Sequence, residues 1–255
     1  MKTAITREVS SAFASCELTF IDREPIDLDL ARRQHKAYEA ALGRLGVRVV
    51  ALPEEPTLAD SVFVEDTAVV LNEIAVITRP GAVSRRPETS SIAETLSLFR
   101  PLVHLAEPYT LDGGDVLVVD KTIYIGITSR TDRDSVLAFQ ALVEPYGYLV
   151  RAVPVEGCLH LKSAATLCTP DMLLLHPARI DKAHFKGLHF LEIDLREPHA
   201  ANGVLVGESL IYPTGFPRTL EKLETLGIQI ETVDISELAK AEGAVTCCSL
   251  LFDSA

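Results

Sequence analysis

The sequence predicts an α/β fold in which a strand–turn–strand–helix–strand unit is repeated around a ring. Short β-rich runs split by turns recur at intervals of about fifty residues, as in repeat proteins that stack to bury a core. The two ends of the chain can complete a further unit, which would remove exposed sheet edges. No Ser-, Gly- or Pro-rich linker divides the chain, so we expect residues 1–255 to form a single domain.

Hairpins are predicted where two β-rich runs flank a short turn. They are expected at 66–71 and 74–78, at 115–119 and 122–126, at 164–168 and 172–176, and at 203–206 and 209–213. Helices are predicted where apolar residues recur at i, i+3 and i+4, as at Val136, Phe139 and Val143. They are expected at 29–45, 91–99, 132–146 and 218–226, with following strands at 47–50, 102–105, 148–153 and 228–233.

A fifth unit can be assembled from both ends of the chain. Residues 3–6 are expected to pair with residues 249–252, and the helix at 29–45 and the strand at 47–50 complete the unit. Five such units would give the ring pseudo-fivefold symmetry. The pattern alone is equally compatible with a plain α+β domain that contains ordinary hairpins.

The charge of the chain excludes some classes of partner. Its 255 residues carry 36 acidic and 24 basic side chains, for a net charge of −12, whereas nucleic acids and anionic membranes are bound by basic patches. No apolar run reaches the ~18 residues of a membrane span, and the N-terminus shows no apolar signal core. Five cysteines without regular spacing fit a reducing compartment. We therefore expect a cytoplasmic protein, present as a monomer or homodimer.

Two adjacent cysteines, Cys247 and Cys248, lie between a Gly-containing stretch and a short apolar run. A thiolate is the strongest nucleophile that a side chain offers near neutral pH, but it needs a base or a cation to hold it in that form. A cysteine taken alone is more often an inert, packed thiol. The interpretation as a nucleophile therefore requires a histidine and carboxylates nearby.

Polar residues at the starts of the repeats could supply these groups. In a ring, equivalent ends of the units converge on the axis, which would bring these positions together. They are Asp60, Glu65, Asp66, Asp112, Asp115, His160 and Asn202. Ordinary interpretations stay open, because an Asp at a strand start is usually a turn residue and a His between apolar neighbours is more often part of a core. In a regular strand, Glu65 and Asp66 would point in opposite directions.

The spacing of the candidate ligands disfavours a metal site. The sequence contains no Cys-x-x-Cys and no His-Glu-x-x-His, and adjacent cysteines cannot easily chelate one zinc ion. The other cysteines, Cys16, Cys158 and Cys168, are interpreted as structural. We expect neither a metal nor another cofactor.

Several motifs, taken together and in this order, resemble those of the dimethylarginine dimethylaminohydrolases, within the guanidine-modifying superfamily. They extend along nearly the whole chain: DSVFVED at 60–66, ITRPGAVSRR at 77–86, LDGGD at 111–115, IGITSRT at 125–131, HLK at 160–162 and TCCS at 246–249. None of these motifs is specific by itself. The resemblance implies a five-unit ββαβ propeller, the pentein fold, which agrees with the repeat described above.

The resemblance also implies roles for individual residues. Cys247 matches the nucleophile that attacks the guanidinium carbon and forms a covalent thiouronium. His160 matches the general acid/base, and Asp112 matches the carboxylate that holds it, where many relatives carry Glu. The substrate would be a small cationic guanidino amino acid, an Nω-methylated L-arginine. Hydrolysis would give L-citrulline and dimethylamine or methylamine.

Further matches concern substrate binding. Asp66 matches the carboxylate that grips the guanidinium nitrogens, and Arg85 and Arg130 match the pair that binds the carboxylate of the amino acid. The remaining matches are Asp60 and Glu65 at further binding positions, Leu18 in a flexible lid, and Ala241, a backbone contact before the nucleophile. The lid, residues 14–20, is the part of the chain least similar to the family.

Two alternative functions remain open. A related guanidine enzyme, a deiminase or an amidinotransferase acting on arginine or another guanidine, would use the same kinds of residue. Arginine deiminases usually carry an added helical domain, for which a chain of 255 residues has no room. The alternative from another class is a non-catalytic propeller that binds a partner, as in ribosome anti-association factors. Such a protein would not need Cys247, His160 and Asp112 together.

Overall fold

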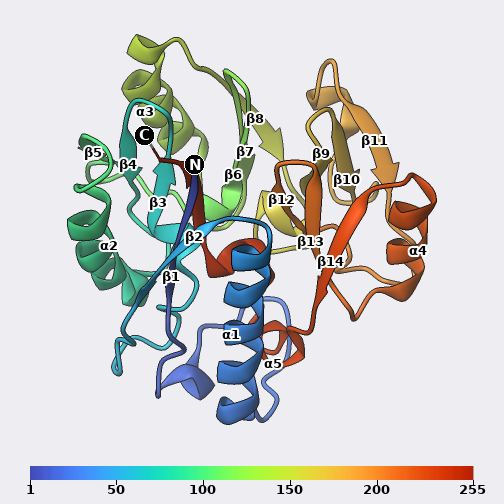
Figure 1. Cartoon of the computed structure of the whole chain (residues 1–255). Coiled ribbons are helices and arrows are strands. Elements are labelled where there is room, and N and C mark those ends of the chain that lie inside the picture. The colour runs from blue at the N-terminus through green and yellow to red at the C-terminus, as the bar shows by residue number, and fades with distance from the viewer. Residues whose placement is uncertain (255) are drawn as a thin grey trace.

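The computed structural model of the chain describes residues 1–254 and confirms the predicted five-unit ββαβ propeller. Over these residues the strands form five three-stranded sheets (Figure 1). The middle strand of each sheet pairs antiparallel with one neighbour and parallel with the other. The sheets are β15 (Leu250–Asp253), β1 (Lys2–Arg7) and β2 (Arg48–Leu52); β3 (Ala68–Val70), β4 (Ala75–Ile77) and β5 (Leu102–His104); β6 (Val116–Val119), β7 (Thr122–Ile127) and β8 (Leu149–Pro154); β9 (Ala165–Thr169), β10 (Met172–Leu175) and β11 (His189–Glu192); and β12 (Val204–Val206), β13 (Ser209–Pro213) and β14 (Gln229–Val233).

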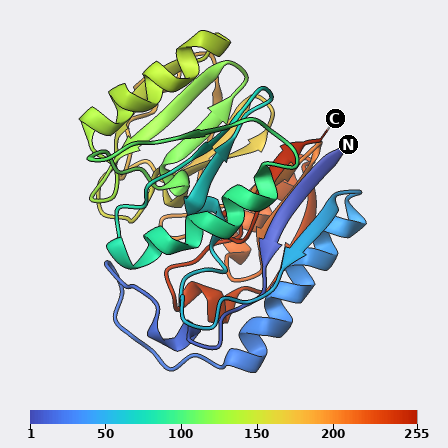
Figure 2. The same ribbon diagram turned by 90° about the vertical axis from the view of Figure 1, so that its left-hand side faces the viewer.

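The ends of the chain close the ring. β1 pairs antiparallel with β15, with Thr3 opposite Phe252 and Ile5 opposite Leu250, and it pairs parallel with β2. Figure 2 shows the two termini side by side at one corner of the molecule. This pairing confirms the prediction that residues 3–6 lie against residues 249–252. It also satisfies the backbone groups of β1 on both sides, so β1 is not an exposed edge.

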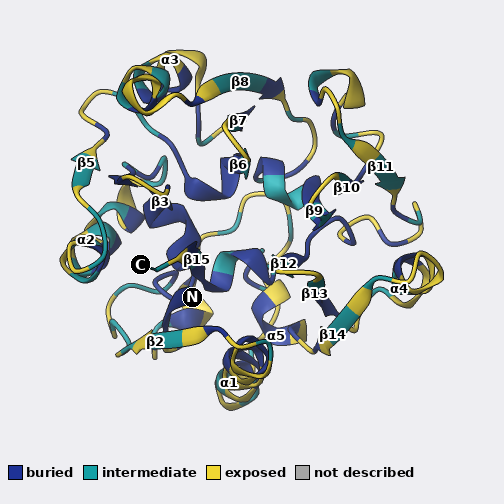
Figure 3. Ribbon diagram, turned by 45° about the horizontal axis from the view of Figure 1, so that its top comes forward, coloured by how far each residue is buried: buried dark blue, intermediate teal, exposed yellow. Residues whose placement is uncertain are grey.

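Helices cover the outside of the ring. They are α1 (Leu28–Arg44), α2 (Thr89–Leu96), α3 (Arg133–Val143) and α4 (Pro217–Thr225), with the short α5 (Ser236–Ala239) before the cysteine stretch. Figure 3 shows α1 to α4 at the rim, with mostly exposed residues on their outer faces. The side chains of Asp27 and Asp132 cap α1 and α3 by accepting backbone N–H groups of the first turn. Among the helices described, none has the length and apolar character needed to cross a lipid bilayer.

The third unit departs from the repeat. Between β10 and β11 the chain forms a 3-10 turn, Lys182–His184, where the other units carry an α-helix. β11 pairs parallel with β10, although the sequence pattern does not predict a strand at 189–192. Residues 189–192 contain only two apolar side chains between a histidine and a glutamate, so their β character depends on pairing with β10.

The first strand of each hairpin, together with β15 of the closing unit, lines a cavity along the axis of the ring. Residues of β3, β6, β9, β12 and β15 form the wall of this cavity. Glu65, Lys162 and Thr246 also line it, and Glu65 contacts the other two. Lys162 Nζ lies 2.6 Å from Glu65 Oε1, and the Thr246 hydroxyl donates to Glu65 Oε2 at 2.8 Å. The turn that carries Cys247 is therefore anchored at the axis.

Candidate active site

A second, narrow cavity is lined by most of the predicted site residues. The predicted residues that line it are Asp60, Asp66, Arg85, Arg130, His160, Ala241 and Cys247. Asp112 is fully buried and contacts His160, whereas Glu65 lines the axial cavity. Leu18 packs against the core cluster that contains Ala241. The structure thus brings residues from all parts of the chain to one place.

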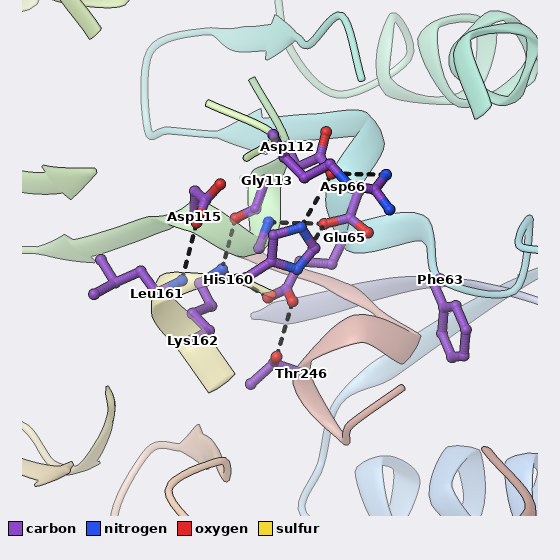
Figure 4. Close-up of polar contacts among 12 residues, drawn as sticks. Phe63, Glu65, Asp66, Asp112, Gly113, Asp115, His160, Leu161, Lys162 and Thr246 are labelled. Atoms are coloured by element: carbon purple, nitrogen blue, oxygen red, sulfur yellow. Dashed lines mark hydrogen bonds and ion pairs between the residues drawn. The ribbon is translucent and has the colours of Figure 1, made fainter. Parts of the chain in front are cut away.

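His160 and Asp112 form a buried pair in this site. His160 precedes the 3-10 turn Leu161–Ser163, and its Nε2 lies 3.0 Å from Asp112 Oδ2. The other carboxylate oxygen of Asp112 accepts the backbone N–H of Gly81 at 2.8 Å. His160 Nδ1 lies 3.9 Å from Asp66 Oδ1, so the ring sits between two carboxylates (Figure 4). One ring nitrogen is thus held by Asp112 while the other faces Asp66.

Two glycines allow these groups to approach one another closely. A Cβ on Gly114 would lie 2.6 Å from His160 Nδ1 and 2.8 Å from Asp66 Oδ1. A Cβ on Gly113 would lie 2.0 Å from the carbonyl oxygen of Glu65. The backbone N–H of Gly114 donates to Asp66 Oδ1 at 2.9 Å. The glycine pair of the LDGGD motif is therefore required by close packing, of Gly114 against the histidine and of Gly113 against the backbone of Glu65.

Asp115, the last residue of that motif, connects several site loops. Its buried carboxylate accepts the N–H of Leu161 at 2.9 Å and the hydroxyls of Thr128 and Thr131 at 2.7 Å each. Thr131 Oγ1 in turn accepts the N–H of Asp112 at 3.3 Å. Burial raises the pKa of Asp115 to about 6 in spite of these hydrogen bonds. Asp115 thus fixes the backbone on both sides of the histidine–carboxylate pair.

Asp66 is a buried carboxylate that is paired with a buried guanidinium. Its Oδ2 forms an ion pair with Arg85, which also pairs with Glu88 at 2.8 Å and donates to the carbonyl of Phe63 at 2.9 Å. Burial opposes the ionisation of Asp66, but His160 and Arg85 outweigh it and lower its pKa to about 2. Burial raises the pKa of Glu88 to about 7 despite Arg85. Asp66 therefore remains a carboxylate at neutral pH.

The acidic surroundings set the protonation of His160 and Cys247 in the free protein. Burial disfavours the imidazolium, but Asp66 and the hydrogen bond with Asp112 outweigh burial and raise the pKa of His160 to about 9. Burial, together with Glu65 and Asp66, raises the pKa of the Cys247 thiol well above its usual value. We therefore expect a protonated histidine and a protonated thiol in the same cavity at neutral pH.

This thiol pKa predicts slow alkylation of Cys247 in the free protein at neutral pH. The rate should increase with pH through the alkaline range, because only the thiolate reacts. A bound guanidinium ligand that does not react should lower the apparent pKa, because it adds positive charge beside the sulfur. The measurement is the alkylation rate of the Cys247 peptide, followed by mass spectrometry over a pH series with and without the ligand. An apparent pKa that the ligand leaves unchanged would count against this electrostatic account.

Burial distinguishes the two adjacent thiols. They lie on a 3-10 turn, Thr246–Cys248, rather than in an extended segment. Cys247 is partly exposed and lines the cavity, whereas Cys248 is fully buried in the core cluster packed against α1. Cys248 Sγ lies 3.5 Å from the carbonyl oxygen of Ala244, and burial raises its pKa. Cys247 is the thiol that a molecule in the cavity can reach.

The predicted lid contacts the wall of the same cavity. Arg130 Nη2 lies 3.3 Å from Thr19 Oγ1. Asp60 Oδ2 accepts the N–H of Glu17 at 3.1 Å, and burial raises the pKa of Asp60. Glu17 and Thr19 flank the predicted contact residue Leu18. Lid residues thus lie against two of the predicted binding residues.

The expectation of a regular strand at residues 66–71 was wrong at its start. Glu65 and Asp66 lie on a 3-10 turn, Val64–Thr67, and β3 begins only at Ala68. The hydroxyl of Thr78 donates to the carbonyl of Asp66 at 2.6 Å, so this carbonyl bonds to a side chain instead of a neighbouring strand. Both carboxylates are buried, Glu65 toward the axial cavity and Asp66 toward the second cavity.

The sequence indicates no role for Gly81, Glu88 and Lys162, which contact residues of the site. Glu88 follows Arg85 by three residues, a spacing typical of ion pairs on a helical turn, and this signal could have indicated it. Gly81 and Lys162 lie inside the motifs that carry the family resemblance. Gly81 contacts Asp112 through its backbone N–H, and Lys162 forms a long-range ion pair with Glu65. Neither contact has a signature in the local sequence.

A cluster of potential metal ligands lies in the site. Within residues 1–254, donor atoms of Asp66, Asp112 and His160 lie within 4.8 Å of one another. A metal ion there would compete with the Arg85 ion pair and with a proton on His160, since the pKa of His160 is raised to about 9. The donor set therefore fits proton transfer better than metal binding.

Comparisons with known proteins agree with this geometry. The family model described as "N,N dimethylarginine dimethylhydrolase, eukaryotic" matches residues 19–173. The N(G),N(G)-dimethylarginine dimethylaminohydrolase of Streptomyces coelicolor is 40% identical over 251 residues, which are 98% of this chain and 96% of that protein. The protein of the same name from Pseudomonas aeruginosa is 38% identical over 228 residues, 89% of this chain and 90% of that protein. A solved structure of the Pseudomonas aeruginosa enzyme, a cysteine-to-serine mutant complexed with citrulline, matches with a TM-score of 0.93 and 35% identity over 98% of each chain.

Proposed function

Because this chain belongs to the dimethylarginine dimethylaminohydrolase family of carbon–nitrogen hydrolases, we propose that it hydrolyses Nω-methylated L-arginine to L-citrulline. The second product is dimethylamine from asymmetric dimethylarginine and methylamine from monomethylarginine. One observation carries the proposal: a single cavity is lined by a thiol, by an imidazole paired with a buried carboxylate, and by a second buried carboxylate. These groups can act as nucleophile, general acid/base and guanidinium-binding anion.

The guanidinium of the substrate pairs with Asp66 in this proposal. Asp66 suits that role because its pKa of about 2 keeps it ionised. Its position 3.9 Å from His160 places the bound guanidinium beside the acid/base. The central guanidinium carbon would then lie within reach of Cys247, which lines the same cavity.

In this proposal, Arg130 pairs with the carboxylate at the amino-acid end of the substrate. Asp60, Leu18 and Ala241 surround that end. Arg85 is the second cation of the expected pair. It already donates to two carboxylates and to backbone carbonyls, so it could bind the substrate carboxylate only by exchanging one of these contacts. Arg130 therefore contributes most of the carboxylate binding in this proposal.

The first half-reaction forms a covalent adduct. The cationic substrate favours deprotonation of Cys247, whose proton is released to solvent, and the thiolate sulfur then forms a bond to the guanidinium carbon. His160 is protonated below its pKa of about 9, and it donates this proton to the dimethylamine nitrogen as the C–N bond breaks. The products are free dimethylamine and a thiouronium on Cys247.

The second half-reaction releases citrulline. His160, now neutral, removes a proton from water, whose oxygen forms a bond to the thiouronium carbon. The C–S bond then breaks and the thiolate leaves with the bonding electrons. The remaining hydroxyl proton of the adduct is transferred to the departing thiolate, which forms the carbonyl group of citrulline and restores the thiol. Asp112 supports both steps, since its hydrogen bond to Nε2 at 3.0 Å orients the ring and stabilises the imidazolium. The nitrogen that exchanges the proton is then Nδ1.

The proposal is tested by an assay of the purified protein with asymmetric dimethylarginine and, in parallel, with free arginine. We expect equal amounts of citrulline and dimethylamine from the methylated substrate. Citrulline and ammonia from arginine alone would move the protein to the deiminase alternative. Absence of turnover of both substrates would refute the hydrolase proposal and favour amidino transfer or a binding role.

A further inference from the structure

Three consecutive backbone N–H groups at the end of the lid point at one carboxylate. Glu242 Oε2 accepts the N–H of Thr19 at 2.8 Å, and Oε1 accepts those of Phe20 and, at 3.1 Å, Ile21. Successive N–H groups around an anion form a nest, in which the ionised acceptor makes charge-assisted hydrogen bonds. In Figures 1 and 2, the segment before α1 lies beside the segment at α5, as this contact requires. The nest therefore joins two distant parts of the chain.

A rigid turn presents this carboxylate. Glu242 has a φ of 56°, in the left-handed region that side-chain-bearing residues seldom adopt. The N–H groups of its neighbours Ala241 and Gly243 both donate to the carbonyl of Leu238, at 3.0 and 3.1 Å. A Cβ on Gly243 would lie 2.3 Å from the ring of Phe63, so the turn is also tightly packed. The neighbours hold the backbone at Glu242, and that backbone directs the carboxylate to the lid.

The same turn is part of the cavity wall. Ala241, Glu242 and Gly243 line the cavity together with Cys247, four residues after Gly243. The lid is thus fixed to the segment that leads into the thiol. Any movement of the lid away from the turn would break three hydrogen bonds to one residue at the same time.

Two other lid contacts would change on substrate binding. The bonds from Arg130 to Thr19 and from Glu17 to Asp60 involve residues at which the proposed function places the amino-acid end of the substrate. Glu242 has no such assignment. Glu242 can keep its three hydrogen bonds to the lid when the substrate engages Arg130 and Asp60.

We propose that Glu242 is a positioning residue whose carboxylate holds the lid closed over the catalytic cavity. It acts through the lid and not on the reacting atoms. Its effect on substrate binding rests on the proposed function, because a closed lid keeps Leu18 and Thr19 at the amino-acid end of the substrate. Lid closure itself does not depend on which substrate the protein uses.

Amide hydrogen exchange tests the closure directly. The change Glu242→Ala removes every acceptor, so exchange at Thr19, Phe20 and Ile21 should accelerate at least about tenfold, as expected when charge-assisted hydrogen bonds are lost. Glu242→Gln keeps the side-chain length and one acceptor oxygen, and we expect an intermediate acceleration. This second variant also decides the matter if the alanine variant does not fold.

Glu54→Gln is the matched control. Glu54 Oε2 accepts the N–H of Ser11 at 2.7 Å, so it is a glutamate that binds the same N-terminal segment outside the lid. The Glu54→Gln change should leave hydrogen exchange at the three lid amides and the steady-state kinetics unchanged. Lid amides that stay protected in both Glu242 variants would overturn the proposal, whatever the substrate.

Steady-state kinetics with asymmetric dimethylarginine test the consequence for binding. Glu242→Ala should raise KM about tenfold or more and change kcat much less, whereas loss of a catalytic group would lower kcat. Released lid amides with unchanged KM and kcat would overturn the positioning role. If the wild type turns over no methylarginine, the proposed function fails, and the exchange result alone decides whether Glu242 holds the lid.

Discussion

Replacing Cys247 by alanine should abolish the formation of citrulline from asymmetric dimethylarginine while leaving the fold intact. The thiol lines the cavity and is partly exposed, and the proposed reaction passes through a bond to its sulfur. Loss of a nucleophile that acts in concert with a base typically lowers kcat by more than about 10⁴-fold. The measurement is citrulline formation at saturating substrate, together with circular dichroism to verify folding. Substrate should still bind, because Asp66 and Arg130 are unchanged.

Cys248 provides the matched control for the neighbouring thiol. Its side chain is fully buried in a core cluster, with Sγ 3.5 Å from the carbonyl of Ala244. Cys248→Ala should cost about 1 kcal/mol of folding stability, as a small core truncation does, and should retain most of the activity. An active Cys247→Ala protein, or a folded but inactive Cys248→Ala protein, would contradict the assignment of the nucleophile.

Replacing His160 by glutamine should lower kcat by about 10²- to 10⁴-fold, the usual contribution of general acid–base catalysis. The sign of the pH dependence follows from the raised pKa. His160 donates a proton to the leaving amine, so wild-type kcat/KM should fall as the pH rises through about 9 and the imidazolium is lost. His160→Gln should lack this alkaline decline, because the group that titrates is absent.

Asp112→Asn tests the origin of that pKa. Its hydrogen bond and charge raise the pKa of His160, so the variant should move the alkaline decline to lower pH. At neutral pH its kcat should fall, but less than in His160→Gln. An NMR titration of the His160 ring in the wild type and the variant measures the shift directly. A wild-type pKa near the ordinary 6.5, or one unchanged by Asp112→Asn, would contradict this account.

Local signals predicted most of the fold. The turn at Asp120 and Lys121 separates two β-rich runs, and it joins β6 to β7 in the structure. Asp120 adopts a φ of 52°, which aspartate tolerates in tight turns. Closure of the ring was also predictable, since strands at 3–6 and 249–252 would otherwise leave exposed sheet edges. These features depend on residues close in sequence or on pairing between complementary edges.

The third unit shows where local signals fail. β11 has only two apolar residues, and the connection before it, Lys182–His184, forms a 3-10 turn in place of a helix. Pairing with β10 supplies the hydrogen bonds that make residues 189–192 a strand. Tertiary context decides such segments, because their intrinsic preference is weak.

The candidate site also contains residues that the sequence predicts and contacts that it does not. Family motifs placed Cys247, His160 and Asp112 together, and the structure brings all three to one place. The partners that tune them could not be predicted from the sequence. Arg85 pairs with Asp66 across 19 residues, and Glu242 binds Thr19 across 223 residues. Such contacts depend on the three-dimensional arrangement of the units and have no periodicity along the chain.

The most direct test of the central claim is the mass of the protein during turnover. Wild-type protein mixed with asymmetric dimethylarginine and quenched in acid should contain a species heavier by the substrate less dimethylamine. Peptide mapping should place this adduct on Cys247. Citrulline formation without an adduct on any residue, under conditions in which the adduct would accumulate, would contradict the covalent mechanism. An adduct on Cys248 would contradict the assignment of the nucleophile.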